Sequence, residues 1–402
     1  MKLSRIISIA LVCMTTAGIA GAATLSDQEK LGKAIFFDEN LSINQNQSCA
    51  TCHNPAAGWT GATSEVNAGT VVYEGSISGR FGNRKPPSSA YATTSPIFHY
   101  DTKAGLFIGG NFWDGRATGE RLGNPAAEQA QGPFLNPLEQ ALGTAADVID
   151  KICDNKNYSN LFREVCGPKA CDKKNVNTAY DCVGRSVAAY EGSSESNAFS
   201  SKFDAFMKGE TKLTSSEQQG LSLFMGKGKC NKCHIISLNK NSGPSLFTDY
   251  TFDNLGIPRY LKNPFYHADS EFNPDGDKWI DPGLGGFLMS RPDYASFADA
   301  NKGKHKVPTL RNVDKRPYPM FVKAYGHNGY FKSLKEIVHF YNTRDVLRTC
   351  NPGDPDEKIT CWPAPEVPQN INTAELGDLK LTDAQENAIV DFMKTLSDGY
   401  LK

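Results

Sequence analysis

The feature that most constrains this chain is a short motif, C-x-x-C-H, that occurs twice. Two thiols three residues apart on one helical turn can both form thioethers with the vinyl groups of a haem. The next residue, histidine, then lies under the ring and binds the iron. The two copies are Cys49, Cys52 and His53, in "SCATCHNP", and Cys230, Cys233 and His234, in "CNKCH". Together they predict two covalently bound c-type haems.

Two other interpretations of the motif fit less well. A zinc site would need a second pair of thiols or imidazoles at finger spacing, and the sequence has none there. A redox dithiol of the thioredoxin kind would need a βαβ context, which the sequence does not indicate.

The segment before each motif is also repeated. "LSDQEKLGKAIFF" aligns without a gap to "LTSSEQQGLSLFM", with Gly32 matched to Gly220. Each copy begins with a capping box, Ser/Thr-x-x-Glu, which predicts the start of a helix. We therefore expect a mainly α fold of two cytochrome c-like domains, residues 23–205 and 206–402. Each domain is held around one haem and carries long loops rich in Gly, Pro, Asn and Ser.

Residues 1–22 predict export. Lys2 and Arg5 precede an apolar run and a small-residue site ending at Ala22, the pattern of a cleaved secretory signal peptide. The apolar run is shorter than the roughly 20 residues that a bilayer needs, so we expect a periplasmic protein with no membrane span. The chain has 43 basic and 44 acidic residues, and loss of Lys2 and Arg5 leaves it mildly acidic. This charge balance argues against a nucleic-acid partner.

Six further cysteines remain in the exported chain, an even number that predicts three disulfides. Cys350 and Cys361 flank a turn-rich polar loop, "NPGDPDEKIT", and are expected to pair with each other. The other four allow three pairings. The one that we favour is Cys166–Cys171 with Cys153–Cys182.

A third capping box, from Thr382 to Gln385, opens the last predicted helix. Four apolar residues follow at helical spacing, which predicts a face packed in the core. They are Ile389, Phe392, Met393 and Leu396.

Several stretches resemble the bacterial dihaem cytochrome c peroxidase and MauG family over nearly the whole exported chain. Besides the two haem motifs, they are "FFDENLS", "FWDGRA", "EQAQGPFLNPLE", "FDNLG", "VPTLRN" and "SLKEIVHFY". The resemblance implies that the N-terminal haem, over His53, reacts with hydrogen peroxide. It also implies that the C-terminal haem, over His234, relays electrons.

The resemblance assigns roles to five further residues. Trp113 matches the family's tryptophan that lies between the haems and couples them. Glu139 matches the distal glutamate that moves a proton between the peroxide oxygens, a task that a partly desolvated carboxylate can perform. Gln129 matches the distal glutamine. Arg84, in "RKPP", and Arg311, in "VPTLRN", are expected to contribute to haem binding.

Two departures from the peroxidase pattern favour the MauG-like branch. Many of the peroxidases cap the N-terminal iron with a second histidine, but Ile77 stands at that position and His99 lies on a different stretch. We therefore expect an open N-terminal haem. The peroxidases also carry a methionine ligand at the C-terminal haem, where this chain has Tyr341. Two residues earlier, His339 would point to another helical face.

Two further positions differ from the family. The resemblance implies a calcium ion between the domains, held partly by an asparagine after the conserved arginine. Here that residue is Lys85, which cannot bind a cation. Lys315 stands near the partner carbonyls, whose backbone oxygens could still serve, so the sequence leaves a calcium ion open. MauG also carries a surface tryptophan two residues before the second haem motif, where this chain has Gly228.

The sequence thus predicts a periplasmic dihaem oxidoreductase. It would use the oxidising equivalents of peroxide on an external reductant or on a protein side chain, as MauG-like enzymes do. One alternative is a conventional cytochrome c peroxidase, reduced by a small cytochrome or copper protein. A second is a dihaem electron-transfer cytochrome without enzymatic activity. The resemblance to the peroxidases also implies a homodimer.

Overall fold

The computed structural model describes residues 24–239 and 241–401, and its fold is mainly α, as predicted. The predicted signal peptide, residues 1–22, lies outside the described part of the chain. The helices are α1 (Asp27–Phe36), α2 (Cys49–Cys52), α3 (Ser64–Ala68), α4 (Pro125–Leu135), α5 (Ala145–Asp154), α6 (Ser159–Cys166), α7 (Val176–Gly192), α8 (Lys202–Met207), α9 (Ser215–Met225), α10 (Gly283–Met289), α11 (Leu334–Thr343) and α12 (Asp383–Lys394).

Three small two-stranded sheets join segments of the loops. The antiparallel pairs are β1 (His99–Asp101) with β2 (Leu106–Ile108) and β3 (Phe252–Asp253) with β4 (His305–Lys306). The parallel pair is β5 (Arg348–Cys350) with β6 (Cys361–Pro363).

The repeated segments form α1 and α9, and both begin with the predicted capping box. Helix α1 packs on α7, and α9 packs on α12. A Cβ atom on Gly32 would lie 1.8 Å from the carbonyl oxygen of Ser186 in α7. One on Gly220 would lie 1.9 Å from the carbonyl oxygen of Ala388 in α12. At both crossings the helices approach so closely that only glycine fits.

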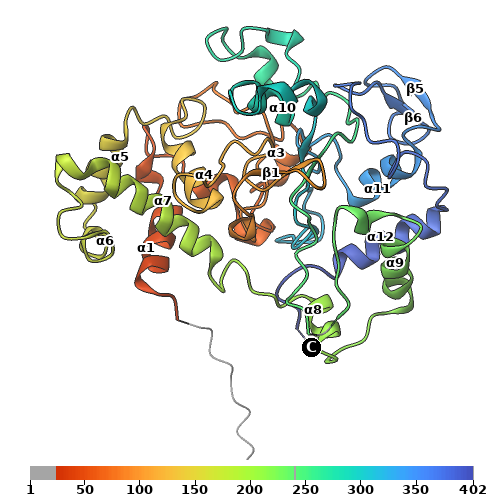
Figure 1. Cartoon of the computed structure of the whole chain (residues 1–402), viewed down its shortest axis with the longest axis horizontal. Coiled ribbons are helices and arrows are strands. Elements are labelled where there is room, and N and C mark those ends of the chain that lie inside the picture. The colour runs from red at the N-terminus through yellow and green to blue at the C-terminus, as the bar shows by residue number, and fades with distance from the viewer. Residues whose placement is uncertain (1–23, 240, 402) are drawn as a thin grey trace, which may run out of the picture.

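Two hydrophobic cores lie on opposite sides of the molecule (Figure 1). One core gathers around α1, α4, α5, α6 and α7, and the other around α9, α11 and α12. The predicted domain boundary between residues 205 and 206 falls inside α8, whose Phe203 packs in the second core. Val71 and Val72, from the N-terminal half, also pack there. The division into two domains remains a prediction.

The predicted face of the last helix is confirmed. Helix α12 begins with the Thr382–Gln385 capping box. Its predicted apolar face is buried in the second core, at Ile389, Phe392, Met393 and Leu396.

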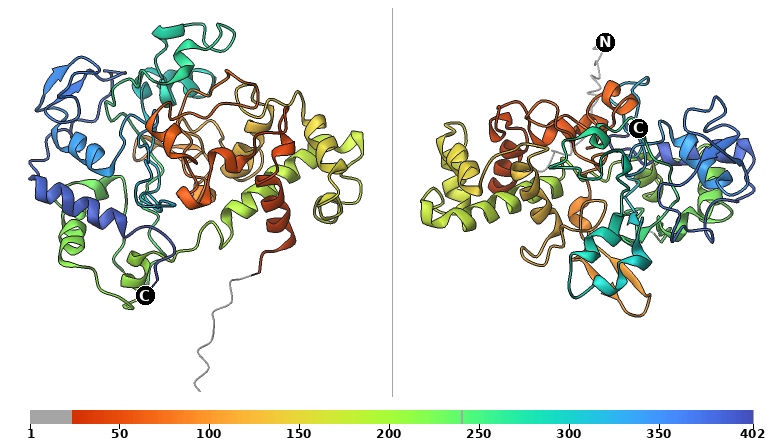
Figure 2. Two further views of the ribbon diagram at one scale, coloured as in Figure 1. Left: turned by 180° about the vertical axis from the view of Figure 1, so that it is seen from behind. Right: turned by 90° about the horizontal axis from the view of Figure 1, so that it is seen from above.

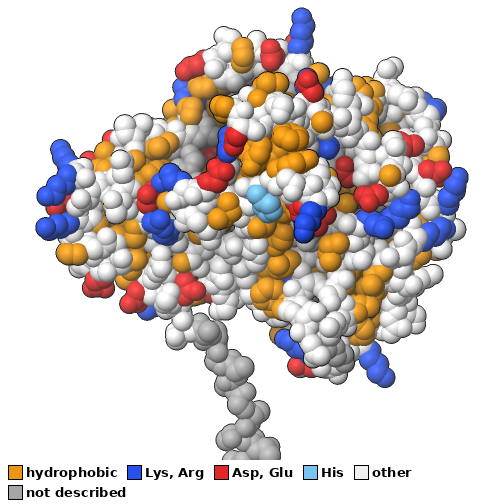
Figure 3. Space-filling view, in the orientation of Figure 1, with side chains coloured by type: hydrophobic (Ala, Val, Ile, Leu, Met, Phe, Trp, Pro, Cys, Tyr) orange, Lys and Arg blue, Asp and Glu red, His pale blue; other side chains and the backbone are white. Residues whose placement is uncertain are grey.

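A third, smaller cluster is formed by the β1–β2 hairpin, β3 and the segment around α10. The hairpin and the α10 segment project together from the body of the molecule (Figure 2, right). Basic and acidic side chains are interspersed over the face seen in Figure 3, and hydrophobic side chains gather beside the α10 segment. No helix in residues 24–239 and 241–401 is long and apolar enough to cross a membrane.

One of the three predicted disulfides is confirmed, and the other two were predicted wrongly. Cys350 pairs with Cys361 across the polar loop. The remaining bonds are Cys153–Cys171 and Cys166–Cys182, in place of Cys166–Cys171 and Cys153–Cys182. Cys166, the last residue of α6, is bonded to Cys182 in the second turn of α7. Helix packing, which sequence spacing does not reveal, therefore decides the pairing.

Candidate active site

Each C-x-x-C-H motif forms one tight turn at the wall of a cavity. In both, the backbone N–H of the histidine donates to the carbonyl of the first cysteine at 2.9 Å, in the pairs His53–Cys49 and His234–Cys230. The four motif cysteines are free of disulfides. Burial raises the pKa of the Cys49 and Cys230 thiols to about 12 each. The motifs therefore present neutral, unpaired thiols, as thioether formation with haem requires.

The two motif histidines are oriented in the same way. Nδ1 of His53 lies 3.1 Å from the carbonyl oxygen of Trp59, and Nδ1 of His234 lies 2.8 Å from that of Phe247. Each carbonyl accepts from Nδ1–H and so fixes the tautomer that leaves Nε2 unprotonated. A second partner of this kind is usual for a metal-bound histidine. Both sites thus fit a haem iron bound through Nε2.

The N-terminal cavity, of about 990 Å³ including its mouth, brings most of the predicted catalytic residues together. His53, Glu139, Gln129 and Trp113 all line it. Gln129 comes from α4, while Glu139 lies in the turn that follows α4. Three residues remote from the haem motif in sequence therefore line the same cavity as His53.

Glu139 is held by its backbone and has a perturbed side chain. Its N–H donates to the carbonyl of Asn136 at 2.9 Å, and its carbonyl accepts from the N–H of Ser76 at 2.7 Å. Burial raises the pKa of the Glu139 carboxyl, and Arg116 and Asn136 oppose the shift. A carboxyl can take up and release a proton during catalysis, and a raised pKa makes its protonated form more accessible.

His53 is the one histidine among the described residues that line this cavity. Ile77, at the position of the peroxidases' second histidine, does not line it. His99 is exposed on β1, with Nδ1 2.8 Å from the carbonyl oxygen of Ile97. Neither position therefore offers an imidazole opposite His53.

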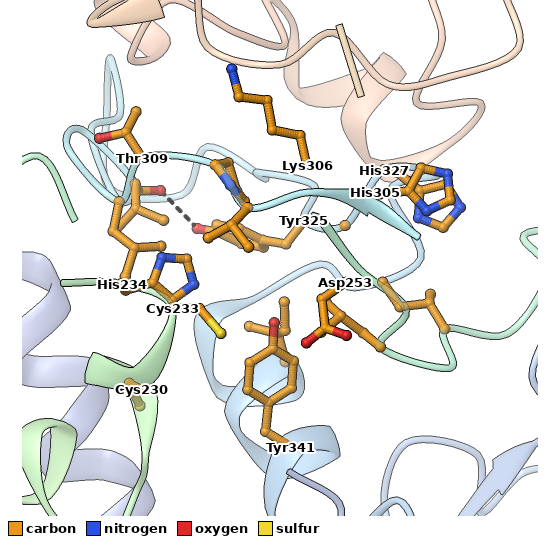
Figure 4. A pocket seen from close by; sticks show the side chains of 18 of the residues that line it. Cys230, Cys233, His234, Asp253, His305, Lys306, Thr309, Tyr325, His327 and Tyr341 are labelled. Carbon is orange, nitrogen blue, oxygen red and sulfur yellow. Dashed lines mark hydrogen bonds between the residues drawn. The ribbon is translucent and has the colours of Figure 1, made fainter. Parts of the chain in front are cut away.

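The C-terminal cavity is larger, about 1670 Å³ including its mouth. The Tyr341 side chain rises into it from α11 and the His234 ring enters from the other side (Figure 4). His339 points elsewhere: its Nδ1 lies 3.0 Å from Glu386 and its Nε2 lies 3.1 Å from the carbonyl oxygen of Ile359. Tyr341 is thus the side chain of α11 that faces the second motif.

The surroundings of Tyr341 are buried and acidic. Burial raises the pKa of its hydroxyl, and the motif thiols and Asp253 act in the same direction. The Asp253 carboxylate lies beside the Tyr341 hydroxyl (Figure 4). Cys233 Sγ lies 3.6 Å from a carboxylate oxygen of Glu375. These protein groups alone favour a neutral tyrosine, so a phenolate here would need a nearby cation such as a haem iron.

Trp113 lines both cavities and is 9% exposed. Its indole Nε1–H donates to the carbonyl of Lys85 at 2.7 Å, and its own carbonyl accepts from the N–H of Lys306 at 2.8 Å. These bonds hold the indole between the two motifs.

Arg84 and Arg311 line the N-terminal and C-terminal cavities respectively, but carboxylates engage their guanidinium groups. Arg84 donates to Asp281 through two nitrogens, each at 2.7 Å, and to Asp114 at 2.6 Å. Arg311 donates to the two oxygens of Asp204 at 3.0 and 2.8 Å. Both arginines therefore tie distant segments together at the cavity walls. Their contact with haem remains a prediction.

The residues at the predicted calcium position do not fit that ion. The Lys85 ammonium donates to Thr60 Oγ1 and to the Pro86 carbonyl, each at 2.9 Å. Burial lowers the pKa of Lys85 to about 8. The Lys315 carbonyl accepts from the Lys323 ammonium at 2.9 Å. Lysine nitrogens thus take up carbonyl oxygens that a calcium ion would need.

Sequence reasoning missed a second group of polar residues. Asp281, His305 and His327 meet at one edge of the C-terminal cavity. They are more than 20 residues apart, so no local motif marks them. The one signal was that two of only seven histidines in the chain stand near "VPTLRN".

Comparison with known proteins decides the family. A family model described as "Di-haem cytochrome c peroxidase" matches residues 26–212. "Methylamine utilization protein MauG" of Paracoccus denitrificans is 33% identical over 390 residues, which cover 96% of this chain and 93% of that protein. The chain belongs to the di-haem cytochrome c peroxidase family.

Other members of this di-haem family support the same assignment. "Cytochrome c551 peroxidase" of Pseudomonas aeruginosa is 32% identical over 337 residues, covering 84% of this chain and 78% of that protein. The crystal structure of the diheme peroxidase BthA from Burkholderia thailandensis superposes with a TM-score of 0.75 at 29% identity, covering 92% of this chain and 86% of that one. The protein is thus an enzyme of the cytochrome c peroxidase class. The family description implies two haems, and the chain has two motifs to hold them.

Proposed function

We propose that this protein is a periplasmic MauG-like enzyme that reacts with hydrogen peroxide at its N-terminal haem. It uses the oxidising equivalents on an external reductant or on a protein side chain. The relatives include both MauG and cytochrome c peroxidases, so the choice depends on the cavities. The observation that carries it is the contrast between Tyr341, which faces His234, and the N-terminal cavity, where His53 has no opposing histidine.

Bound through the two motifs, the haems would supply redox-active irons that exchange electrons with peroxide and with the reductant. The chain's part at the N-terminal site is to handle protons. Glu139 takes a proton from one peroxide oxygen and returns it to the other, because its raised pKa keeps both forms accessible. Gln129 donates an amide N–H toward the same space and orients the bound peroxide.

At the C-terminal site, Tyr341 sets the redox character. A phenolate is a hard, anionic ligand that favours ferric iron and lowers its reduction potential, whereas a methionine thioether favours ferrous iron. A haem held by His234 and Tyr341 would accept electrons poorly from a small cytochrome. It would instead suit the sharing of oxidising equivalents.

Trp113 is the proposed link between the two haems, since it lines both cavities. The route out to a protein substrate differs from that of MauG. A Cβ atom on Gly228 would lie 2.9 Å from the Leu223 carbonyl and 3.1 Å from Ile389, so a tryptophan does not fit there. Electrons from a protein substrate therefore enter by another path.

We also propose two domains and a homodimer for this protein. The division at residues 205 and 206 gives each haem its own domain. Homodimerisation follows from the resemblance to the peroxidases. The leading alternative is a conventional cytochrome c peroxidase, which takes electrons from a small cytochrome or copper protein. The names of the relatives as peroxidases and MauG argue against a plain electron carrier.

The test mixes the diferric holoprotein with one equivalent of hydrogen peroxide in a stopped-flow spectrometer, with no reductant present. A MauG-like enzyme reacts at once, and the absorption of both haems changes. A conventional peroxidase stays inert until it has been half-reduced, and that result would overturn the proposal. The same experiment in the Trp113→Phe variant should confine the first change to one haem.

A further inference from the structure

Three side chains outside the proposed catalytic machinery converge at one edge of the C-terminal cavity. His305 lies on β4, and Asp281 lies two residues before α10. His327 lies two residues after Tyr325, in the loop that leads to α11. The two imidazoles stack with their centroids 3.6 Å apart and their planes inclined by 8° (Figure 4). One potential ligand atom from each of the three side chains lies within 4.8 Å of the other two.

These groups are buried, and their hydrogen bonding is incomplete. The side chains of His305, His327 and Asp281 are 10%, 7% and 2% exposed. Nε2 of His305 and Nε2 of His327 have no hydrogen-bond partner. A buried polar atom without a partner is costly, so two such atoms side by side call for a ligand or an ion.

The tautomer of His305 leaves a lone pair on the Nε2 atom that faces Asp281. Its Nδ1 lies 3.1 Å from the Gly303 carbonyl oxygen, which can only accept, so Nδ1 carries the proton. The Nε2 lone pair then faces Asp281 Oδ2 at 3.3 Å. A lone pair that faces a carboxylate oxygen is repelled unless a proton or a metal ion lies between them.

Carboxylates reach the histidine pair from two sides. Asp281 and Asp114 pair with Arg84, Asp114 also pairs with Arg116, and Glu366 lies 3.9 Å from Arg259. Three carboxylates thus face three guanidinium groups, and the surrounding side chains are balanced in charge. A second carboxylate also reaches the histidine pair, because Glu366 Oε2 lies 3.8 Å from His327 Nε2.

We propose that Asp281, His305 and His327 form a third metal site, for a divalent ion of the zinc type, with Glu366 as a fourth ligand. Imidazole nitrogens and carboxylate oxygens without a thiolate are a donor set that zinc accepts in tetrahedral geometry. The four proposed ligands belong to neither haem motif, and they line the same cavity as the second motif and Lys85.

Binding requires a small rearrangement of the pair. A metal lies close to the plane of each imidazole that holds it, and two parallel stacked rings cannot both meet that condition. One ring must therefore turn about its Cβ–Cγ bond to bring both Nε2 atoms within about 2.0–2.2 Å of the ion. The bound ion would then tie together three loop segments that little regular structure supports.

The test measures zinc binding to the holoprotein, with its haem content fixed at two irons per chain. After dialysis against zinc and removal of loose ions, metal analysis should find one zinc per two irons. Isothermal titration with Zn²⁺ should give an affinity that falls more than tenfold in His305→Phe and in Glu366→Gln. The exposed His267 provides the control, since His267→Gln should bind zinc like the parent protein.

Two further measurements distinguish the loss of the metal site from misfolding of a variant. Zinc should raise the Tm of the parent protein and leave the Tm of His305→Phe unchanged, because a ligand stabilises only the fold that binds it. Anomalous diffraction above and below the zinc edge should show a peak among the three side chains. The proposal is overturned if no peak appears and the Nε2 atoms donate to haem propionates. It is also overturned if zinc binds equally well to the variants.

Discussion

The N-terminal and C-terminal cavities are alike on the side that carries the haem motif. They differ in the other residues that line them. In both, a histidine N–H closes the motif turn and a backbone carbonyl holds Nδ1. The cavity of His53 is also lined by an acid and an amide, Glu139 and Gln129. Opposite His234 lies Tyr341, with acidic groups beside it. A duplicated unit can therefore keep its haem attachment while the facing loops and helices give each copy its own chemistry.

The largest expected effect comes from the N-terminal wall. Glu139→Gln removes the proton-transfer group, so kcat/KM for peroxide should fall by about 10²–10⁴. The parent enzyme should gain activity as pH rises through the raised pKa of Glu139, because the carboxylate is the base. The variant should lack that rise. Steady-state assays from pH 4 to 8 measure both, with the exposed Glu39→Gln as the control.

The next effect tests the C-terminal wall. Tyr341→Met replaces a hard anionic ligand by a thioether, so the potential of the C-terminal haem should rise by roughly 0.1 V or more, within the ~0.8 V range that axial ligands span. Spectroelectrochemical titration measures it, and the N-terminal haem in the same molecule is the internal control. An unchanged potential would mean that Tyr341 is an ordinary packed tyrosine.

A smaller effect concerns what the two halves have in common. Gly32→Ala and Gly220→Ala each place a Cβ against a carbonyl oxygen of the crossing helix. Each should lower the free energy of unfolding by about 1–3 kcal/mol through overpacking. Urea titration of the holoproteins measures the loss. Gly243→Ala, which meets no atom within 4 Å, should be near neutral, and equal stability of all three variants would contradict the matched crossings.

An effect of similar size concerns how the helix of Tyr341 is held. Glu386 on α12 accepts from Asn342 at 2.7 Å and from His339 at 3.0 Å, both on α11. Burial acts against the charged form, but bonds from His339, Lys335 and Asn342 outweigh it and lower the pKa of Glu386 to about 2. Glu386→Gln should lower the free energy of unfolding by about 1–3 kcal/mol at pH 5–6.

The pH dependence gives this last prediction its sign. A depressed carboxyl pKa stabilises the fold above its ordinary value of 4.5, and the gain disappears as pH falls towards 2. The bond to Glu386 raises the pKa of His339, which adds stability that is lost as pH rises through that pKa. The difference between parent and variant should therefore narrow below pH 4.5. A constant difference in urea melts at pH 3, 5 and 6 would contradict the mechanism.

Much of the fold could be predicted because its signals are local. Capping boxes, the apolar face of α12 and the Cys350–Cys361 loop each lie within a dozen residues of sequence. Glycine in the repeated segments hinted at a shared role, but the Gly32 and Gly220 crossings depend on partners about 150 or more residues away. The pairing of Cys153, Cys166, Cys171 and Cys182 failed for the same reason, because the packing of α5, α6 and α7 decides it.

In the candidate site, too, only the residues with a local sequence signal could be predicted from chemistry alone. The haem motifs could be derived from chemistry alone, while Glu139, Gln129 and Trp113 came from resemblance, since no spacing links them. Lys85 was seen to be wrong for calcium, yet its donation to Thr60 and Pro86 needed coordinates. The cluster of Asp281, His305 and His327 was missed because its members come from three segments that are distant in sequence.

The contrast between the two cavities is tested most directly by the low-temperature EPR spectrum of the diferric holoprotein. An open iron over His53 beside a His234–Tyr341 haem predicts one high-spin and one low-spin signal in equal amounts. In Tyr341→Met the low-spin signal should move while the high-spin signal stays. Two low-spin haems in the parent protein would mean that a sixth ligand caps the N-terminal iron, and that result would contradict the account.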